Sequence, residues 1–221
     1  MDIDRLKNRY RGATATDYED HRRDSKKWQR EQAAVADFVE QIASADGDPL
    51  FLDVPVGTGR FFDVYEENSV SAVGVDVSED MLAEARSGLN DRSTEISLQR
   101  GDIMNLSELD IDPDAVVCIR FMNWLDTEDI GAALSSIADT GPDHIIVGIR
   151  VRNSTKHRIG GAARRSYHRV FSKSNSKTTV HDERRVRNYF ADYGFSIGDR
   201  RLVDEGIYGD KYVYRLIADG R

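Results

Sequence analysis

Five short strand-like runs, separated by stretches with helical periodicity, constrain the fold of this 221-residue chain more than any other feature. The runs are 49–54, 71–77, 96–103, 115–121 and 144–151. Short apolar runs such as PLFLDV and AVVCIRF are typical of strands buried on both faces in a parallel sheet. Strands that alternate with helices predict right-handed βαβ units, and therefore an α/β fold with a doubly wound, mostly parallel sheet.

The two ends of the chain extend this core. An amphipathic helix is expected over residues 25–47, with Trp28 packed in the core, and a second helix over residues 182–194. Two final strand-like runs, 196–208 and 211–218, are joined by a Gly-Asp pair and predict an antiparallel hairpin. The predicted sheet therefore has seven strands.

Composition excludes several classes of protein. No apolar run reaches the roughly 18 residues of a membrane span, and the charged opening MDIDRLKNRY does not resemble a secretory signal. Cys118 is the only cysteine, so neither a disulfide nor a cysteine-based zinc site is expected, and no other metal site is predicted. The formal net charge of -8 weighs against binding to nucleic acid or to an anionic membrane. These features predict a cytoplasmic protein.

The charge is unevenly distributed, because residues 151–181 are strongly basic. This segment holds eight Lys or Arg residues and three of the five histidines, and it contains no Asp or Glu. A block this asymmetric is either a separate functional surface or a solvated loop that pairs with acidic neighbours.

Three of the predicted strands end in acidic residues. The first leads from Asp53 into the turn Gly57-Thr58-Gly59, where glycine permits a close approach of the backbone to a ligand. The second ends at Asp76 and the third at Asp102. In a doubly wound sheet the carboxyl ends of the parallel strands meet at one crevice, where ligands bind. Three carboxylates there suit a ligand that carries amino and hydroxyl donors and a positive charge.

These acids lie in segments that resemble the motifs of class I S-adenosylmethionine-dependent methyltransferases. LFLDVPVGTGRF resembles the family's first motif, AVGVDVSEDMLAEA its second-strand motif, and LQRGDI its third. The segments occur in the family's order and spacing, and the C-terminal hairpin fits the family's last two strands. The resemblance implies a Rossmann-like sheet, the cofactor S-adenosylmethionine, and methyl transfer to a small molecule. Pro55 departs from the family pattern, because it replaces the first glycine of the turn.

The resemblance implies that the residues around the crevice hold the cofactor. The residues of the first motif would face its methionine part: Asp53, Pro55, Gly57 and Gly59. Asp76 would accept hydrogen bonds from the ribose hydroxyls. The residues around adenine would be Val77, Met81, Asp102 and Ile103, with Asp102 accepting the adenine amino group.

Two further segments are implied to complete the site. After the fourth strand, Arg120 would contact the cofactor, and Asn123 and Trp124 would contact the acceptor. The N-terminal stretch resembles the lid of small-molecule members of the family, in which Tyr18 and either Arg22 or Arg23 would close over the cofactor.

The resemblance also bears on the chemistry. A sulfonium methyl donor is already activated, so the protein needs chiefly to align the nucleophile and exclude water. A hydroxyl or protonated amine as acceptor would also need a base. His168 and Tyr167, in the basic segment, are the first candidates, and His157 and Asp126 are alternatives.

The basic segment is expected to cap the acceptor pocket. Arg164 and Arg165 within it suit a carboxylate or phosphate, so the sequence predicts a small, anionic acceptor, bound by a monomer or a homodimer. The whole chain, residues 1–221, is expected to form one domain. Its predicted parts are a helical lid (1–47), a cofactor-binding core (48–150), the basic capping segment (151–181) and a C-terminal helix and hairpin (182–221).

Three alternatives remain open. A nucleic-acid methyltransferase would use residues 151–181 as its binding surface, although the run RFMN at residues 120–123 lacks the two prolines typical of DNA base N-methyltransferases. A non-catalytic binding module would keep the fold, and Pro55 is the feature that favours it. A nicotinamide oxidoreductase would need a third glycine, whereas RFF follows Gly59 here.

Overall fold

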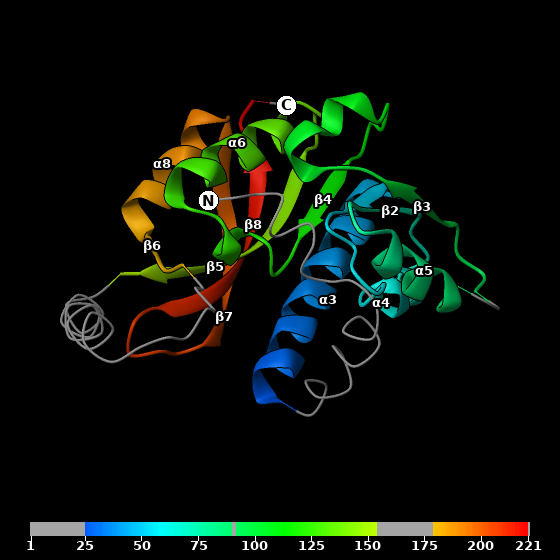
Figure 1. Cartoon of the computed structure of the whole chain (residues 1–221), viewed down its shortest axis with the longest axis horizontal. Helices are drawn as coiled ribbons and strands as arrows, with labels where there is room; N and C mark the ends of the chain where they lie inside the picture. The colour runs from blue at the N-terminus through cyan, green and yellow to red at the C-terminus, as the bar shows by residue number, and fades with distance from the viewer. Residues whose placement is uncertain (1–24, 90–91, 154–178, 221) are drawn as a thin grey trace.

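A mixed eight-stranded sheet forms the centre of the computed structural model, which describes residues 25–89, 92–153 and 179–220 (Figure 1). The strands are β1 (Phe51–Asp53), β2 (Ala72–Asp76), β3 (Ile96–Arg100), β4 (Ala115–Cys118), β5 (His144–Arg152), β6 (His181–Asp182), β7 (Phe195–Asp204) and β8 (Asp210–Ala218). The helices are α3 (Lys26–Asp46), α4 (Phe62–Glu67), α5 (Glu79–Ser87), α6 (Thr127–Ala138) and α8 (Glu183–Asp192), with 3-10 turns η1 (Ile103–Glu108) and η2 (Met122–Trp124).

The strand order, β3-β2-β1-β4-β5-β8-β7, confirms the doubly wound α/β sheet with an antiparallel C-terminal hairpin. All seven predicted strands are present. The eighth strand, β6, was not predicted, and it has only two residues, which pair in parallel with β5. A strand this short leaves no periodic pattern in the sequence.

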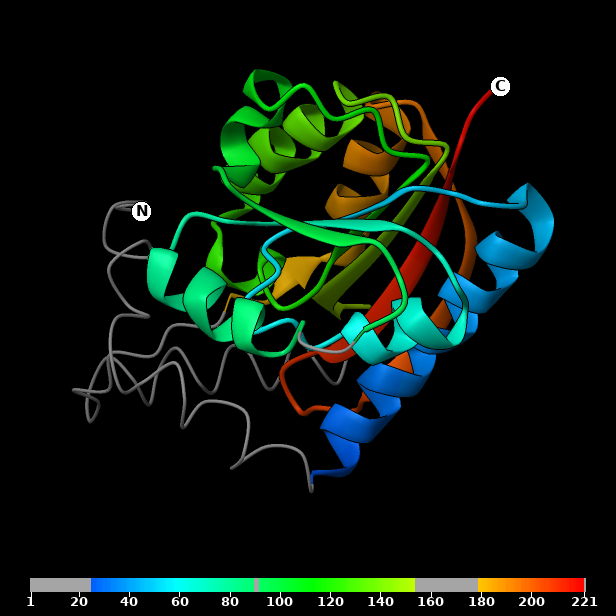
Figure 2. The same ribbon diagram turned by 90° about the vertical axis from the view of Figure 1, so that its right-hand side faces the viewer.

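Helices cover both faces of the sheet, as Figure 2 shows. Side chains of α3, α4 and α5 pack in one hydrophobic cluster with Phe51 and Val117. Side chains of α6 and α8 pack in a second cluster with Leu52 and Val116. Successive residues of a strand point to opposite faces, so neighbouring residues of β1 and of β4 divide between the two clusters.

Helix α3 begins and ends where the sequence predicts. The Ser25 hydroxyl accepts a hydrogen bond from the backbone N–H of Trp28 over 3.2 Å, and Gly47 follows the helix with a φ of 84°. Glycine adopts such a positive φ without a steric cost. Fully buried residues on one face, among them Val35, Phe38 and Ile42, fix the helix to the sheet.

The switch point of the sheet lies at β1, which has β2 on one side and β4 on the other, both parallel to it. The carboxyl ends of β1 to β4 therefore meet at one edge, where a doubly wound sheet binds its ligands. Within the part of the chain that the structure describes, no helix is long and apolar enough to cross a membrane.

Candidate functional site

A pocket of about 170 Å³ opens at the carboxyl ends of β1 to β4. Four segments line it: the turn after β1, the start of α5 with the end of β2, the start of η1, and the loop between β4 and α6. The predicted residues that these segments bring together are Pro55, Gly57, Asp76, Val77, Met81, Asp102, Ile103, Arg120 and Trp124.

Asp76 is the polar centre of this pocket. One of its carboxylate oxygens accepts the backbone N–H of Gly57 at 3.0 Å, and the other accepts the N–H of Ser78 at 2.9 Å. Burial raises the pKa of Asp76, while hydrogen bonds from backbone amides, those of Ser78 and Gly57 among them, oppose that shift. An ionised carboxylate has about four lone-pair sites, so Asp76 can accept a further hydrogen bond from a ligand.

Asp102 lies at the N-cap of η1, where its carboxylate accepts the backbone N–H of Met104 at 3.1 Å. Between the two acids the pocket wall is apolar, with Val77, Met81 and Ile103 among the lining residues. The arrangement offers carboxylates for donor groups and an apolar surface for a planar ring.

The turn after β1 approaches the pocket closely at Gly57. Its φ is 59°, and a Cβ atom built there would have no atom within 4 Å, so a side chain would project into open space. The peptide between Val54 and Pro55 is cis, and Pro55 itself lines the pocket. The turn is tied to β2 by the N–H of Val56, which donates to the carbonyl of Val75 at 2.8 Å.

Two predicted cofactor residues, Asp53 and Gly59, do not line the pocket. A Cβ at Gly59 would lie 2.2 Å from the ring of Phe62, so this glycine is needed for packing under the turn. Asp53 is 2% exposed, and its Oδ2 atom has no hydrogen-bond partner. Burial raises the pKa of Asp53 to about 8, an effect that the phenol of Tyr65 opposes and the charge of Asp76 reinforces. With this pKa, Asp53 is neutral between about pH 4 and pH 8, where an ordinary aspartate is ionised.

A second cavity, of about 290 Å³, adjoins the pocket and shares Arg120 and Trp124 with it. We call it the cationic cavity. The residues that line it are Ser25, Lys27, Trp28, Glu31, Arg120, Asn123, Trp124, Arg150, Val203 and Lys211. Asn123 thus lies here and not in the first pocket, and its side-chain oxygen accepts the backbone N–H of Arg150 at 2.7 Å.

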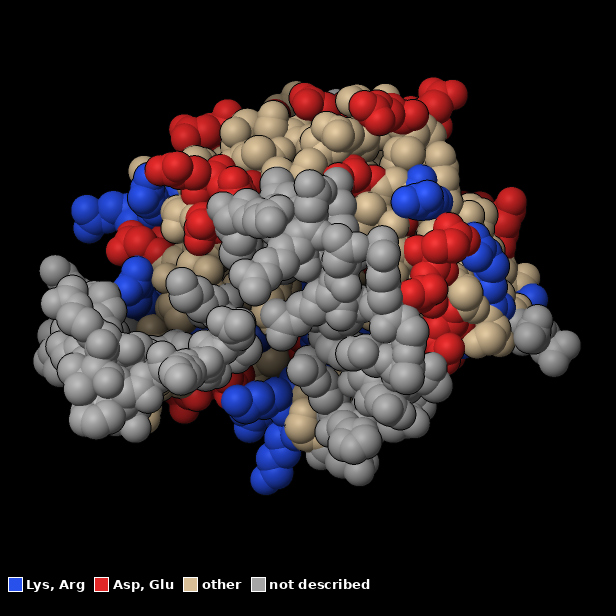
Figure 3. All heavy atoms as spheres, in the orientation of Figure 1, with Lys and Arg blue, Asp and Glu red and all other residues tan. Residues whose placement is uncertain are grey.

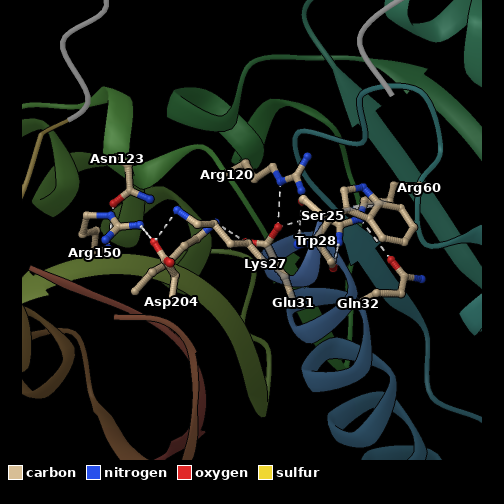
Figure 4. Close-up of polar contacts among 11 residues, drawn as sticks. Ser25, Lys27, Trp28, Glu31, Gln32, Arg60, Arg120, Asn123, Arg150 and Asp204 are labelled. Atoms are coloured by element: carbon tan, nitrogen blue, oxygen red, sulfur yellow. Dashed lines mark hydrogen bonds and ion pairs between the residues drawn. The ribbon is translucent and has the colours of Figure 1, made fainter. Parts of the chain in front are cut away.

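Glu31 lines the cationic cavity and pairs with three basic side chains, of which Figure 4 labels Arg60 and Arg120. It is 1% exposed and accepts from Arg60 and from Arg120 at 2.7 Å each, and also from Lys211. Although burial raises the pKa of Glu31, the three cations outweigh it and hold that pKa at about 2. Glu31 was not predicted from the sequence. The available signal was a charged residue at helical spacing from Val35, on the face of α3 that the apolar residues share.

Arg60 was also missed, and its contacts correct the prediction for Trp28. The Trp28 ring lies in neither hydrophobic cluster, and the Arg60 guanidinium lies 4.3 Å from its centroid. Arg60 also donates to the carbonyl of Trp28 at 2.8 Å and to the side chain of Gln32 at 3.0 Å. Because Arg60 follows the glycine turn, these bonds connect α3 to the wall of the first pocket.

Several predicted site residues lie outside the described residues. They are Tyr18 and Arg22 or Arg23 in the lid, the acceptor-binding candidates Arg164 and Arg165, and the base candidates Tyr167, His168 and His157. The basic capping segment also lies outside them, except for residues 151–153 and 179–181. The roles of these residues stay predictions.

The comparisons with known proteins agree with this geometry. Residues 51–140 match a family model described as a methyltransferase domain. A search of the curated proteins found no match.

Several solved structures share the fold. Magnesium protoporphyrin IX methyltransferase from Synechocystis, solved with bound S-adenosylhomocysteine, has 19% identity over 88% of this chain and 86% of that chain, with a TM-score of 0.67. The same enzyme with bound S-adenosylmethionine gives 17% identity, coverage of 98% and 91%, and a TM-score of 0.63. An S-adenosylmethionine-dependent methyltransferase from Clostridium acetobutylicum gives 15% identity, coverage of 90% and 94%, and a TM-score of 0.62.

Proposed function

We propose that this chain is a class I S-adenosylmethionine-dependent methyltransferase that transfers a methyl group from S-adenosylmethionine to a small, anionic acceptor. The match of residues 51–140 to a methyltransferase domain and the fold shared with solved methyltransferases support this. The observation that carries the proposal is the pairing of two adjoining sites: a pocket with Asp76 and Asp102 at strand ends, and a cavity lined by four basic side chains.

The residues of the first pocket fit the cofactor. Asp76 has lone pairs for the two ribose hydroxyls, and Asp102 has them for the adenine amino group. Val77 and Met81 provide apolar surface for the ring between them. The open space above Gly57 leaves room for the polar chain of the cofactor against the backbone of the turn.

When bound, S-adenosylmethionine supplies a methyl group on a sulfonium, which is already activated for in-line displacement. The task of the protein is therefore to position the two reactants and exclude water. Arg120 and Trp124 line both cavities, so they stand where the cofactor site meets the acceptor site. The described residues of this junction include no histidine, and the base candidates Tyr167 and His168 remain predictions.

The charge of the cationic cavity supports an anionic acceptor. Among the described residues, Lys27, Arg120, Arg150 and Lys211 line it together with one acid, Glu31, while Asp204 pairs with Lys27 and Arg150. The protein as a whole is acidic, and on the face drawn in Figure 3 acidic side chains are spread over the described surface. A concentration of positive charge at this one place favours ligands of the opposite sign.

The test is an acceptor screen in which formation of S-adenosylhomocysteine is measured. Small carboxylates and phosphates are compared with their neutral amides and esters, with amines, and with transfer RNA and duplex DNA. The expected result is turnover with members of the anionic small-molecule set. Turnover with neutral or cationic acceptors only would contradict the anionic assignment, and turnover with a nucleic acid only would replace it by the alternative of a nucleic-acid methyltransferase.

A further inference from the structure

We propose that the cationic cavity binds the carboxylate of an aromatic carboxylic acid, and that Arg120 and the indole N–H of Trp28 are its direct ligands. The inference rests on the proposed function, because it names the class of acceptor and the residues that would select it.

Among the residues that the structure describes, the basic side chains at and beside the cavity outnumber the carboxylates that pair with them. Glu31 is shared by Arg60, Arg120 and Lys211. Asp204 is shared by Arg150 and by Lys27, the latter at 3.1 Å. Five basic side chains thus share two carboxylates, and Figure 4 shows the two groups side by side. An anion in the cavity would complete this charge balance.

Arg120 has the geometry of an anion ligand. Its Nε donates to Glu31 at 2.7 Å, and among the described residues no partner is found for its two terminal amino groups. Guanidinium groups bind carboxylates through two parallel hydrogen bonds, which gives direction as well as strength. Arg120 also has a φ of 64°, in the left-handed region that residues with a side chain seldom adopt. Such a conformation is typical of residues held in place at a functional site.

Trp28 supplies an unused donor in the same cavity. Its Nε1 atom is buried, and no hydrogen-bond partner for it is found among the described residues. A buried donor without a partner is rare in proteins and calls for an explanation, which a ligand that accepts from this N–H would supply. A carboxylate has enough lone pairs to accept from this N–H and from Arg120 together.

The aromatic part of the proposal rests on the two tryptophans. The chain contains only Trp28 and Trp124, and both line this cavity. Trp124 also lines the first pocket, so an aromatic ring that packs against it would extend toward the cofactor. An acceptor of this class would have its carboxylate at Arg120 and its ring beside Trp124.

The location of both tryptophans makes intrinsic fluorescence a direct measure of binding here. The full chain, saturated with S-adenosylhomocysteine, would be titrated with benzoate, cyclohexanecarboxylate, benzamide and inorganic phosphate. The expected result is saturable quenching by benzoate, weaker binding of cyclohexanecarboxylate, and none of benzamide. Equal binding of benzamide would overturn the carboxylate assignment. If phosphate or cyclohexanecarboxylate bound as tightly as benzoate, the assignment of an aromatic ligand would be wrong.

Two variants test the named ligands. Trp28→Phe keeps a ring but removes the N–H, and Arg120→Lys keeps the charge for Glu31 but removes the paired donors. Each should raise the benzoate dissociation constant roughly tenfold or more, since each removes a hydrogen bond to a charged group. Trp124 remains in both variants, so its fluorescence can still measure benzoate binding. The control is Arg86→Lys, which alters an exposed salt bridge on α5 and should leave benzoate binding unchanged. Unchanged benzoate binding in both folded variants would contradict the assignment.

Calorimetry with S-adenosylhomocysteine distinguishes failure of this inference from failure of the proposed function. If the wild type binds S-adenosylhomocysteine but no benzoate, this inference fails and the proposed function stands. If it binds neither, the proposed function fails as well.

Discussion

The backbone N–H of Gly57 donates a 3.0 Å hydrogen bond to the carboxylate of Asp76, and this bond ties the turn after β1 to the end of β2. Gly57 and Asp76 are 19 residues apart in sequence. The turn is therefore positioned by an acid that the sequence assigns to ligand binding. A change in either residue should alter both the shape of the turn and the affinity for the cofactor.

The two glycines of the turn should respond differently to alanine. At Gly57 the added methyl group meets no atom, so Gly57→Ala should cost about 1 kcal/mol for its positive φ and chiefly weaken binding of S-adenosylhomocysteine. At Gly59 the methyl group would overlap the buried ring of Phe62, so Gly59→Ala should cost more, roughly 1–3 kcal/mol or above. Urea unfolding and calorimetry on both variants check this. Equal losses of stability would contradict the packing described here.

Glu31→Gln should be strongly destabilising, because it leaves three basic side chains around a buried neutral group. Removing one partner of a buried ion pair typically costs about 3–5 kcal/mol. The exposed Glu79→Gln, which loses only its bridge to Arg86, is the control and should change the free energy of unfolding by less than about 1 kcal/mol.

The effect of Glu31 should depend on pH. Its pKa falls from 4.5 to about 2 on folding, so its stabilisation is complete above pH 4.5 and is lost as the pH falls through about 2. That shift corresponds to about 3 kcal/mol. In urea unfolding, the difference in unfolding free energy between the wild type and Glu31→Gln should narrow as the pH falls from 4.5 to about 2. If this difference in free energy stays constant down to pH 2, the pKa of Glu31 is not lowered on folding.

Asp53 should give the free energy of unfolding a pH dependence of the opposite sign to that from Glu31. Its pKa rises from 3.8 to about 8 on folding, so the folded protein holds a proton that the unfolded chain releases. This contribution lowers stability as the pH rises from about 4 to about 8, by roughly 1 kcal/mol per pH unit. Asp53→Asn should remove that slope from the unfolding free energy. The exposed Asp192→Asn should leave the slope in place, and an unchanged slope in Asp53→Asn would mean that Asp53 is ionised when folded.

Local patterns were enough to predict most of the fold. The strands from β1 to β5 are short runs that each signal a strand without reference to the rest of the chain, and Asp182 and Gly194 do the same for the ends of α8. The acids at the pocket were predictable too, because parallel strands bring their carboxyl ends to one edge.

Contacts between distant segments could not be predicted in this way. Glu31 and Lys211 are 180 residues apart, and no periodicity links α3 to β8. The burial of Asp53 has a similar origin. Alternation along β1 places it on the same side as Phe51, toward Tyr65 of α4, and the strand-end position alone does not reveal this.

The most direct test of the account is calorimetric titration of the full chain with S-adenosylhomocysteine, with Asp76→Ala and the exposed Asp192→Ala as a matched pair. We expect the wild type and Asp192→Ala to bind S-adenosylhomocysteine with dissociation constants in the micromolar range. Asp76→Ala, shown to be folded by its thermal unfolding, should bind at least roughly tenfold more weakly, because it loses the acceptor for the ribose hydroxyls. Absence of binding by the wild type, or equal binding by folded Asp76→Ala, would contradict the assignment of this pocket to the cofactor.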